Sequence, residues 1–521
     1  MSNMDRTSDT MRSPGRTVEA QPIQTASLDD HLQVIRKRTG NSTDIVFREI
    51  RIGKGSGIRV ALVFTDGLVN ETTIQDFIME ALMNDAVDSS LPPCTTLTMD
   101  QVVTFIADQV MPISGVDRID DWYQLYDALF SGQTLVLVDG STEILSLCTL
   151  GWEKRSIQEP GTDVIIRGPR EGFVEILRTN TSMIRRRVKN PDLWLETLQL
   201  GQVTHTNIGI MYMKGIVDEK IVREVRKRLN NIKIDAILES GYIEKLIEDQ
   251  SITPFPTVLT TERPDTVVAN LLEGKVAILV DGTPFVLIVP AVFNQFFQIV
   301  EDYYNRFDIS TALRILRIII YFLSLLAPSI YIAATTFHQE MIPTELLISL
   351  AKQREAVPFP AFIEAFVMEV IFEILREAGV RLPKAVGPAV SIVGALVIGQ
   401  AAVEAGFISP ATVIVVSITA ISSFATPTFA VAISARLLRF LFMVIAGAVG
   451  FYGLILAMLM LLAHLCGLRS FGVPYMSPVS SPMSGSEGSP SISFRTWITR
   501  LMPKLEKRKS TESVGEEDDD A

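Results

Sequence analysis

Cysteine and histidine are scarce in this chain of 521 residues, which has three cysteines and four histidines. Cys94, Cys148 and Cys466 lie far apart at no metal-ligand spacing, so the sequence predicts neither a zinc site nor a disulfide framework. Basic residues are not in excess either, and the formal net charge of −12 argues against nucleic acid as a partner. No stretch resembles a nucleophile elbow, a nucleotide-binding loop or a redox pair. We therefore expect no catalytic residue, no cofactor, no metal and no enzymatic activity.

The second half of the chain contains long apolar runs without a charged residue. Four runs, at residues 318–337, 385–403, 405–435 and 440–463, reach the ~20 residues that cross a bilayer, and Pro410 and Pro427 interrupt the third. The mean hydropathy of +0.30 is too high for a wholly soluble protein. However, 59 acidic and 47 basic residues are too many for a protein that is all membrane. The composition predicts a soluble half and a membrane half with four crossings.

One segment between the first two runs is amphipathic. Residues 361–378 contain four Glu and one Arg. Inserting them alone into lipid would cost on the order of 15 kcal/mol, against a return of about 4 to 5 kcal/mol from the apolar residues. On a helical projection Glu369, Glu373, Arg376 and Glu377 share one face. We expect a helix at the membrane interface, or one with its polar face toward water or protein. Glu364 falls on the apolar side, where it is either paired with a basic side chain inside the bundle or functional.

The chain ends favour a cytoplasmic location for both termini. The N-terminal region has no export signal, Arg314 and Arg317 precede the first apolar run, and six Lys and Arg residues lie between 495 and 509. Residues 1–45 are polar and are predicted to be a disordered tail. Residues 476–521 are predicted to form a Ser/Pro linker, a basic amphipathic helix and an acidic tail.

The soluble half contains an internal repeat. The stretches that start at Ile58 and Thr206 are each a strand, a glycine turn and a helix, and those that start at Thr134 and Val276 are each a strand, an Asp-Gly turn and a strand. Both pairs are about 145 residues apart. We predict two tandem α/β cytoplasmic subdomains at 46–165 and 166–304, followed by an all-α polytopic membrane domain at 305–475.

Other polar residues of the soluble half have structural interpretations. Asp139 and Asp281 precede glycines in predicted hairpin turns, where the turn geometry explains them better than a ligand does. Arg185, Arg186 and Arg187 are interpreted as a solvated face and not as an anion site.

The second apolar run has small residues at close helical spacing. These are Gly387, Ser391, Gly394 and Ala395. Small residues allow two helices to pack closely, which is one interpretation. The other is a pore-lining helix, in which Gly394, Val397, Gln400 and Glu404 face a water path formed by several copies of the chain.

Several motifs from both halves occur together in one known family. They are GPREGFVE from Gly168, ERPD from Glu262, LVDGTPFVLIVP from Leu279, EDYY from Glu301, FHQEMIPTELL from Phe337, PFPAFIEA from Pro358 and ILREAGVRLPKAVGPAVSIVGALVIGQAAVEAG from Ile374. With these motifs, roughly residues 40–475 resemble the A subunit of the GerA-type spore germinant receptors of endospore-forming bacteria. The first 40 residues and the Ser/Pro tail lie outside the common pattern.

The resemblance implies a subunit of a nutrient-sensing complex in the spore inner membrane. It implies two partner subunits, a transporter-like B subunit that holds the germinant and a C-subunit lipoprotein. It also implies self-association of the A subunit into a ring, with an ion-conducting pore through the membrane part. It assigns no germinant-binding residue to this chain.

Three other functions stay open. The chain can be a membrane scaffold that assembles the other subunits without conducting ions, or a sporulation protein of the related stage V AF type. A secondary transporter would require inverted repeats with broken helices in the membrane half. The proline-interrupted run at 405–435 is the one hint of that arrangement, and no second copy matches it.

Overall fold

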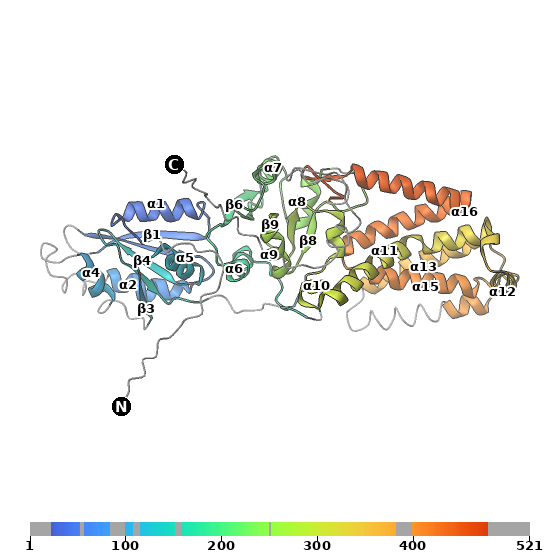
Figure 1. Cartoon of the computed structure of the whole chain (residues 1–521), viewed down its shortest axis with the longest axis horizontal. Coiled ribbons are helices and arrows are strands. Elements are labelled where there is room, and N and C mark those ends of the chain that lie inside the picture. The colour runs from blue at the N-terminus through green and yellow to red at the C-terminus, as the bar shows by residue number, and fades with distance from the viewer. Residues whose placement is uncertain are drawn as a thin grey trace, which may run out of the picture.

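The computed structural model describes residues 22–477, with gaps at 53–56, 84–98, 108–114, 152–158, 162, 164, 166, 250–251 and 382–398. The described chain is elongated, with two sheet-containing subdomains toward one end and a helical bundle at the other (Figure 1). The predicted fold class, two tandem α/β subdomains followed by an all-helical domain, is confirmed.

Two five-stranded antiparallel sheets have the same strand order. The first runs β1 (Ile45–Ile52), β2 (Ile58–Thr65), β4 (Thr134–Val138), β5 (Ile144–Leu147), β3 (Val116–Ile119). The second runs β6 (Leu193–Leu200), β7 (Thr206–Met213), β9 (Val276–Val280), β10 (Val286–Val289), β8 (Leu259–Thr261). All neighbouring strands are antiparallel. The predicted repeat is therefore correct, and the two Asp-Gly turns join equivalent strands.

Helices cover both faces of each sheet. In the first subdomain α1 (Leu28–Arg38) and α5 (Trp122–Phe130) lie on one face, and η1 (Thr73–Met79), α2 (Glu80–Met83) and α4 (Met99–Phe105) lie on the other. In the second, α6 (Leu177–Arg187) and α9 (Pro264–Leu272) lie opposite α7 (Glu219–Asn230) and α8 (Ser240–Ile247). Because successive strand residues point to opposite faces, Val60 and Ala61 of β2 enter different cores. Burial on both faces explains why the middle strands are continuously apolar.

Helix α1 shows that the predicted disordered tail (1–45) is wrong for residues 28–38. Its apolar side chains are buried against the first sheet. The N–H of Leu28 donates to Oδ1 of Asp139 at 3.1 Å, and the N–H of Leu177 at the start of α6 donates to Oδ1 of Asp281 at 3.0 Å. Helix α1 is therefore the counterpart of α6 in the first repeat, and the two turn aspartates hold equivalent helix starts.

Arg185 contradicts the interpretation of the three consecutive arginines as a solvated face. Its side chain is 1% exposed, and its guanidinium donates to both carboxylate oxygens of Asp44, at 2.7 and 3.1 Å. Asp44 precedes β1 and Arg185 lies on α6, so this buried ion pair joins the two subdomains. Arg186 and Arg187 both pair with Glu171.

Gly40 lies at the same junction, between α1 and β1. Its φ is +64°, and a Cβ at this position would lie 2.1 Å from Cδ2 of Trp194 on β6. The indole Nε1 of Trp194 also donates to the carbonyl oxygen of Arg38 at 3.4 Å. The junction therefore needs glycine both for its backbone conformation and for the space that the indole fills.

Replacing Gly40 by alanine should lower the free energy of unfolding by about 2–4 kcal/mol, because backbone strain adds to displacement of a rigid indole. Gly215→Ala is the matched control: its φ is +82°, but nothing lies within 4 Å of the added Cβ. Strain alone should then cost about 1 kcal/mol. Thermal unfolding of the two full-length variants, followed by tryptophan fluorescence, measures the difference. Equal losses of unfolding free energy in the two variants would mean that the indole of Trp194 does not limit the space at Gly40.

The helical half contains α11 (Phe307–Thr336), η4 (Gln339–Met341), α12 (Thr344–Arg354), α13 (Ala361–Arg381), α15 (Pro410–Phe424) and α16 (Phe429–Gly467). Within the described residues, α11 and α16 are long and apolar enough, by length and composition, to cross a membrane. Most of the predicted run at 385–403 lies outside the described residues, as does the predicted C-terminal tail from residue 478 on.

Helix α16 differs from the prediction of a single crossing at 440–463. Gly450 has φ 67° and ψ −148°, which is not helical, and it divides α16 into two arms. Val431 of the first arm and Leu465 of the second both enter the core of the second subdomain. The helix therefore folds back on itself at Gly450 (Figure 1), and the predicted single crossing is wrong.

The run at 405–435 is also divided, at both of its prolines. Helix α15 begins at Pro410 and has 15 residues, and α16 begins two residues after Pro427. Proline fits the first turn of a helix, as Pro410 does in α15, and it disrupts a helix interior, so Pro427 lies outside α16, before its N-cap Thr428. At 1.5 Å per residue α15 is about 22 Å long, shorter than a hydrocarbon core.

After α16 the chain returns to the second subdomain. Residues 468–476, here called the strap, contain β11 (Arg469–Ser470) and β12 (Val473–Pro474). The Oγ of Ser470 accepts the N–H of Ala291 at 3.0 Å, and Tyr475 is fully buried in the core of the second subdomain. The strap therefore belongs to that subdomain, although the sequence assigns it to the membrane domain (305–475).

Candidate functional site

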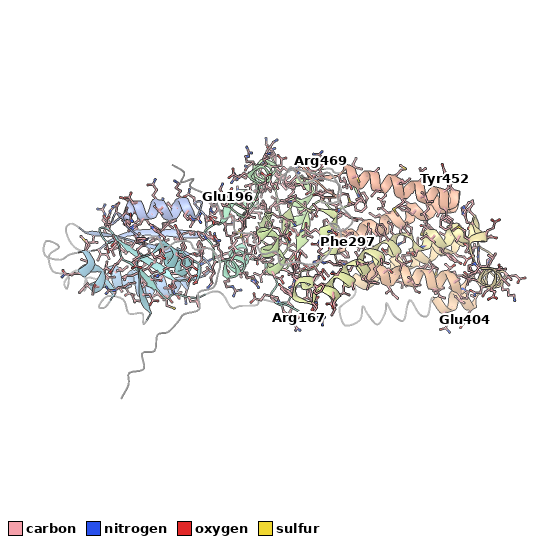
Figure 2. The ribbon with its side chains drawn as sticks, viewed as in Figure 1. Arg167, Glu196, Phe297, Glu404, Tyr452 and Arg469 are labelled. Carbon is pink, nitrogen blue, oxygen red and sulfur yellow. The ribbon has the colours of Figure 1, made fainter. Side chains whose placement is uncertain are left out.

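The predicted pore-lining residues are only partly described. Gly394 and Val397 lie outside the described residues. Gln400 and Glu404 lie on one helical turn, where Nε2 of Gln400 donates to Oε1 of Glu404 at 2.9 Å, and both side chains are exposed. Figure 2 places Glu404 at the end of the bundle that is remote from the sheets. A pore-lining role for these four residues stays a prediction.

Glu364 is fully buried at the N-terminus of α15. One carboxylate oxygen accepts the N–H of Ser409 at 2.9 Å and the hydroxyl of Thr412 at 3.2 Å, and the other pairs with Arg354 at 3.4 Å. A carboxylate in this position satisfies free N–H groups and favours the positive end of the helix dipole. Glu364 therefore has a basic partner and also fixes the start of α15 against α13.

The polar face of α13 points toward protein. Glu369 pairs with Arg439 of α16 at 2.7 Å, and both side chains are 0% exposed. One turn further, Glu373 pairs with Arg436 at 3.2 Å. We call these four residues the charge ladder. Of the two alternatives for this segment, packing with the polar face toward protein is observed. Arg376 on the same face donates to the hydroxyl of Ser423 on α15 at 2.9 Å.

The charge ladder also reaches α11, but its hydrogen bonding is incomplete. Nε of Arg439 donates to the carbonyl oxygen of Ser324 on α11 at 2.7 Å. Among the described residues, Oε1 of Glu369 and Nη2 of Arg439 have no hydrogen-bond partner. A buried ion pair repays its desolvation only when the remaining donors and acceptors are satisfied. The ladder therefore joins three helices through an ion pair that has little surplus stability.

A second buried cluster joins the second subdomain to the helical half. Asp302 lies on the short helix α10 (Glu301–Tyr304) and is 1% exposed. Its carboxylate accepts from Arg314 at 2.8 Å and from Arg317 at 2.8 and 2.9 Å, both on α11. The sequence identifies these arginines as orientation signals. Their i, i+3 spacing puts them on one face of α11, where a single aspartate binds both.

A cavity of about 800 Å³ lies between the two subdomains. Leu68, Phe130, Ser131 and Leu150 line it from the first subdomain, and Pro169, Arg170, Glu171, Arg186, Arg187 and Lys189 line it from the segment that begins the second. Its basic side chains are engaged within the protein: Arg186 and Arg187 pair with Glu171, and Arg170 pairs with Glu159.

Comparison with known proteins assigns the chain to a family. A family model described as "Bacillus/Clostridium GerA spore germination protein" matches residues 33–510. The chain belongs to the GerA family of spore germination proteins. Spore germination protein KA of Bacillus subtilis (strain 168) is 54% identical to this GerA-family chain over 492 residues, 94% of this chain and 87% of that protein. Spore germination protein GerLA of Bacillus cereus is 39% identical over 454 residues, 87% of this chain and 90% of that protein.

One solved structure is also similar to the GerA-family chain. It is the crystal structure of the N-terminal domain of the A subunit of the Bacillus megaterium spore germinant receptor GerK3. It is 41% identical, with a TM-score of 0.41, and covers 53% of this chain and 98% of that one. The resemblance stated from the motifs is confirmed by the family match.

Proposed function

We propose that this chain is the A subunit of a nutrient germinant receptor and forms an oligomeric, ligand-gated ion channel in the spore inner membrane. In this proposal the helical half spans the membrane and both termini are cytoplasmic. The partners are a transporter-like B subunit, a C-subunit lipoprotein and further copies of the chain in a ring. Nutrient binding changes the packing of the subunits and opens the pore.

The observation that carries the proposal is the outer surface of α11 and α16. Large apolar side chains such as Ile319, Ile330, Leu441 and Leu459 are exposed along both helices, whereas the four residues of the charge ladder are paired inside the bundle. This distribution suits contact with lipid, where apolar groups face outward and charges are expensive unless paired. Gln400 and Glu404 are exposed and form a polar surface, which water or other copies of the chain can contact.

The test is ion release from spores in which this chain is the sole A subunit. Val397→Ala and Gln400→Lys change the size and charge of the predicted pore and should alter the rate of potassium release after addition of a nutrient mixture that contains no potassium salt. Ser417→Ala, at an exposed position of α15, is the control and should not. Unchanged release from both pore variants at normal protein levels would instead favour the scaffold function.

A further inference from the structure

We propose that Arg263, Asp265 and Tyr304 form a relay of positioning residues that transmits the position of the inter-subdomain linker to α11. The linker is residues 159–173, apart from 162, 164 and 166, which the structure does not describe. The inference rests on the proposed function, because it assigns the route by which a change in the soluble half reaches the helical half.

In the first step of the relay, the second subdomain forms hydrogen bonds with the linker backbone. Arg263 is 3% exposed at the start of α9, and its Nη2 donates to the carbonyl oxygen of Pro169 at 3.1 Å. The neighbouring Glu262 accepts the N–H of Gly161 at 2.5 Å, and its own carbonyl accepts the N–H of Phe173 at 2.8 Å. The linker backbone is thus held near both ends. The ERPD motif supplies these contacts, which the sequence did not explain.

The linker faces the cavity on its other side. Arg170 and Glu171, which directly follow Pro169, line the cavity between the subdomains. Any change in the separation of the subdomains, or in what fills the cavity, therefore acts on the peptide that Arg263 holds.

The second step runs through Asp265 to Tyr304. Oδ2 of Asp265 accepts from Nη2 of Arg263 at 2.5 Å and from the hydroxyl of Tyr304 at 3.1 Å. Burial, with the nearby Asp265 carboxylate, raises the pKa of Tyr304 to about 12, so its hydroxyl stays a donor at physiological pH. Burial likewise raises the pKa of Asp163, whose carboxylate accepts from Thr261 beside the ERPD motif at 2.8 Å.

Tyr304 also contacts the linker directly. Gly168 has φ +139°, and a Cβ there would lie 2.8 Å from Cε2 of Tyr304, so the ring fills the space that the glycine leaves. In addition the N–H of Arg167 donates to Oε1 of Glu301, at the start of α10, at 3.2 Å. Figure 2 shows Arg167 at the edge between the second subdomain and the helical bundle. The glycine of the GPREGFVE motif and the EDYY motif therefore meet at this point.

The third step is the short helix α10. Tyr304 and Asp302 belong to the same four-residue helix, and Asp302 holds Arg314 and Arg317 of α11. The path from the cavity to α11 thus consists of direct hydrogen bonds, a single helical turn and buried charges that are paired. Contiguous hydrogen bonds and ion pairs of this kind can carry energetic coupling between distant sites.

The test uses spores in which this chain and its partner subunits form the sole receptor, triggered with a mixture of L-amino acids and glucose that contains no potassium salt. Tyr304→Phe keeps the ring against Gly168 and removes one hydrogen bond, so the maximal rate of potassium release should fall about fivefold. The mixture concentration for half-maximal rate should not change. Tyr242→Phe, on the half-exposed surface of α8, is the control and should behave as wild type.

Hydrogen–deuterium exchange of the full chain in nanodiscs provides a readout that does not depend on conduction. Tyr304→Phe should raise exchange at residues 307–317, whereas Tyr242→Phe should not. Glu301→Gln, which weakens the second linker contact, should act in the same direction. Unchanged exchange in both Tyr304→Phe and Glu301→Gln overturns the relay. The relay is also overturned if the slower potassium release of Tyr304→Phe is fully explained by a lower protein level. Wild-type spores that release no potassium would contradict the proposed function and leave the exchange result to decide the relay.

Discussion

Replacing Asp302 by alanine is expected to lower the free energy of unfolding by about 3–5 kcal/mol, because it leaves the buried Arg314 and the partly buried Arg317 without their shared carboxylate. The side chains of Arg314 and Arg317 are 3% and 14% exposed, so water cannot replace the lost partner at the more buried arginine. Thermal unfolding of the full chain in nanodiscs measures the loss, and the amount of protein in the membrane should fall with it.

The control for Asp302→Ala is Asp308→Ala, which removes an exposed ion pair at the start of α11. Asp308 pairs with Arg306 at 3.1 Å, with side chains 47% and 78% exposed. Asp308→Ala should cost less than about 1 kcal/mol, since solvent screens such a pair. Similar losses for the two variants would mean that Asp302 does not anchor α11.

Local patterns predicted both sheets because each signal is complete within a few residues. The alternation and apolar runs at Ile58 and Thr206, and the Asp-Gly turns after β4 and β9, each specify a strand or a hairpin. Two copies at one spacing then predict a tandem repeat. The structure adds that the copies also share strand order.

Helix α1 and the strap were missed because their stability comes from distant contacts. Helix α1 is polar on average, but Leu28 and Ile35 lie on one face and are fully buried. The internal repeat could have predicted α1, because α6 lies at the equivalent position of the second copy. Both helices end in three consecutive basic residues. The strap has no local pattern of its own and is fixed by hydrogen bonds such as Ser470 to Ala291, 179 residues apart.

The candidate site was predicted in part. Glu369 and Glu373 were placed on one polar face, but their partners were not, because Glu369 and Arg439 are 70 residues apart in the sequence. Arg436 and Arg439 separate the two last apolar runs and are about one helical turn apart, as Glu369 and Glu373 are. Complementary charges about one helical turn apart were the available signal.

Glu369→Ala is the second change with a large expected effect. It leaves Arg439, fully buried between three helices, without its ion-pair partner, which should cost about 3–5 kcal/mol. Glu373→Ala is the matched control on the same helix face, because the side chains of Glu373 and Arg436 are 25% and 17% exposed. The control should cost about 1–2 kcal/mol, since water can reach part of the remaining charge. Thermal unfolding in nanodiscs compares the two.

A double variant separates the stability of the charge ladder from its function. Glu369→Leu with Arg439→Met removes both charges and should restore most of the lost stability, because apolar residues of similar volume replace buried ion pairs at little cost. Under the proposed channel function, α13 and α16 would then be held by apolar packing alone, and potassium should leak without nutrient. Restored stability with normal, nutrient-dependent release would show that the ladder is structural and that gating lies elsewhere in the bundle.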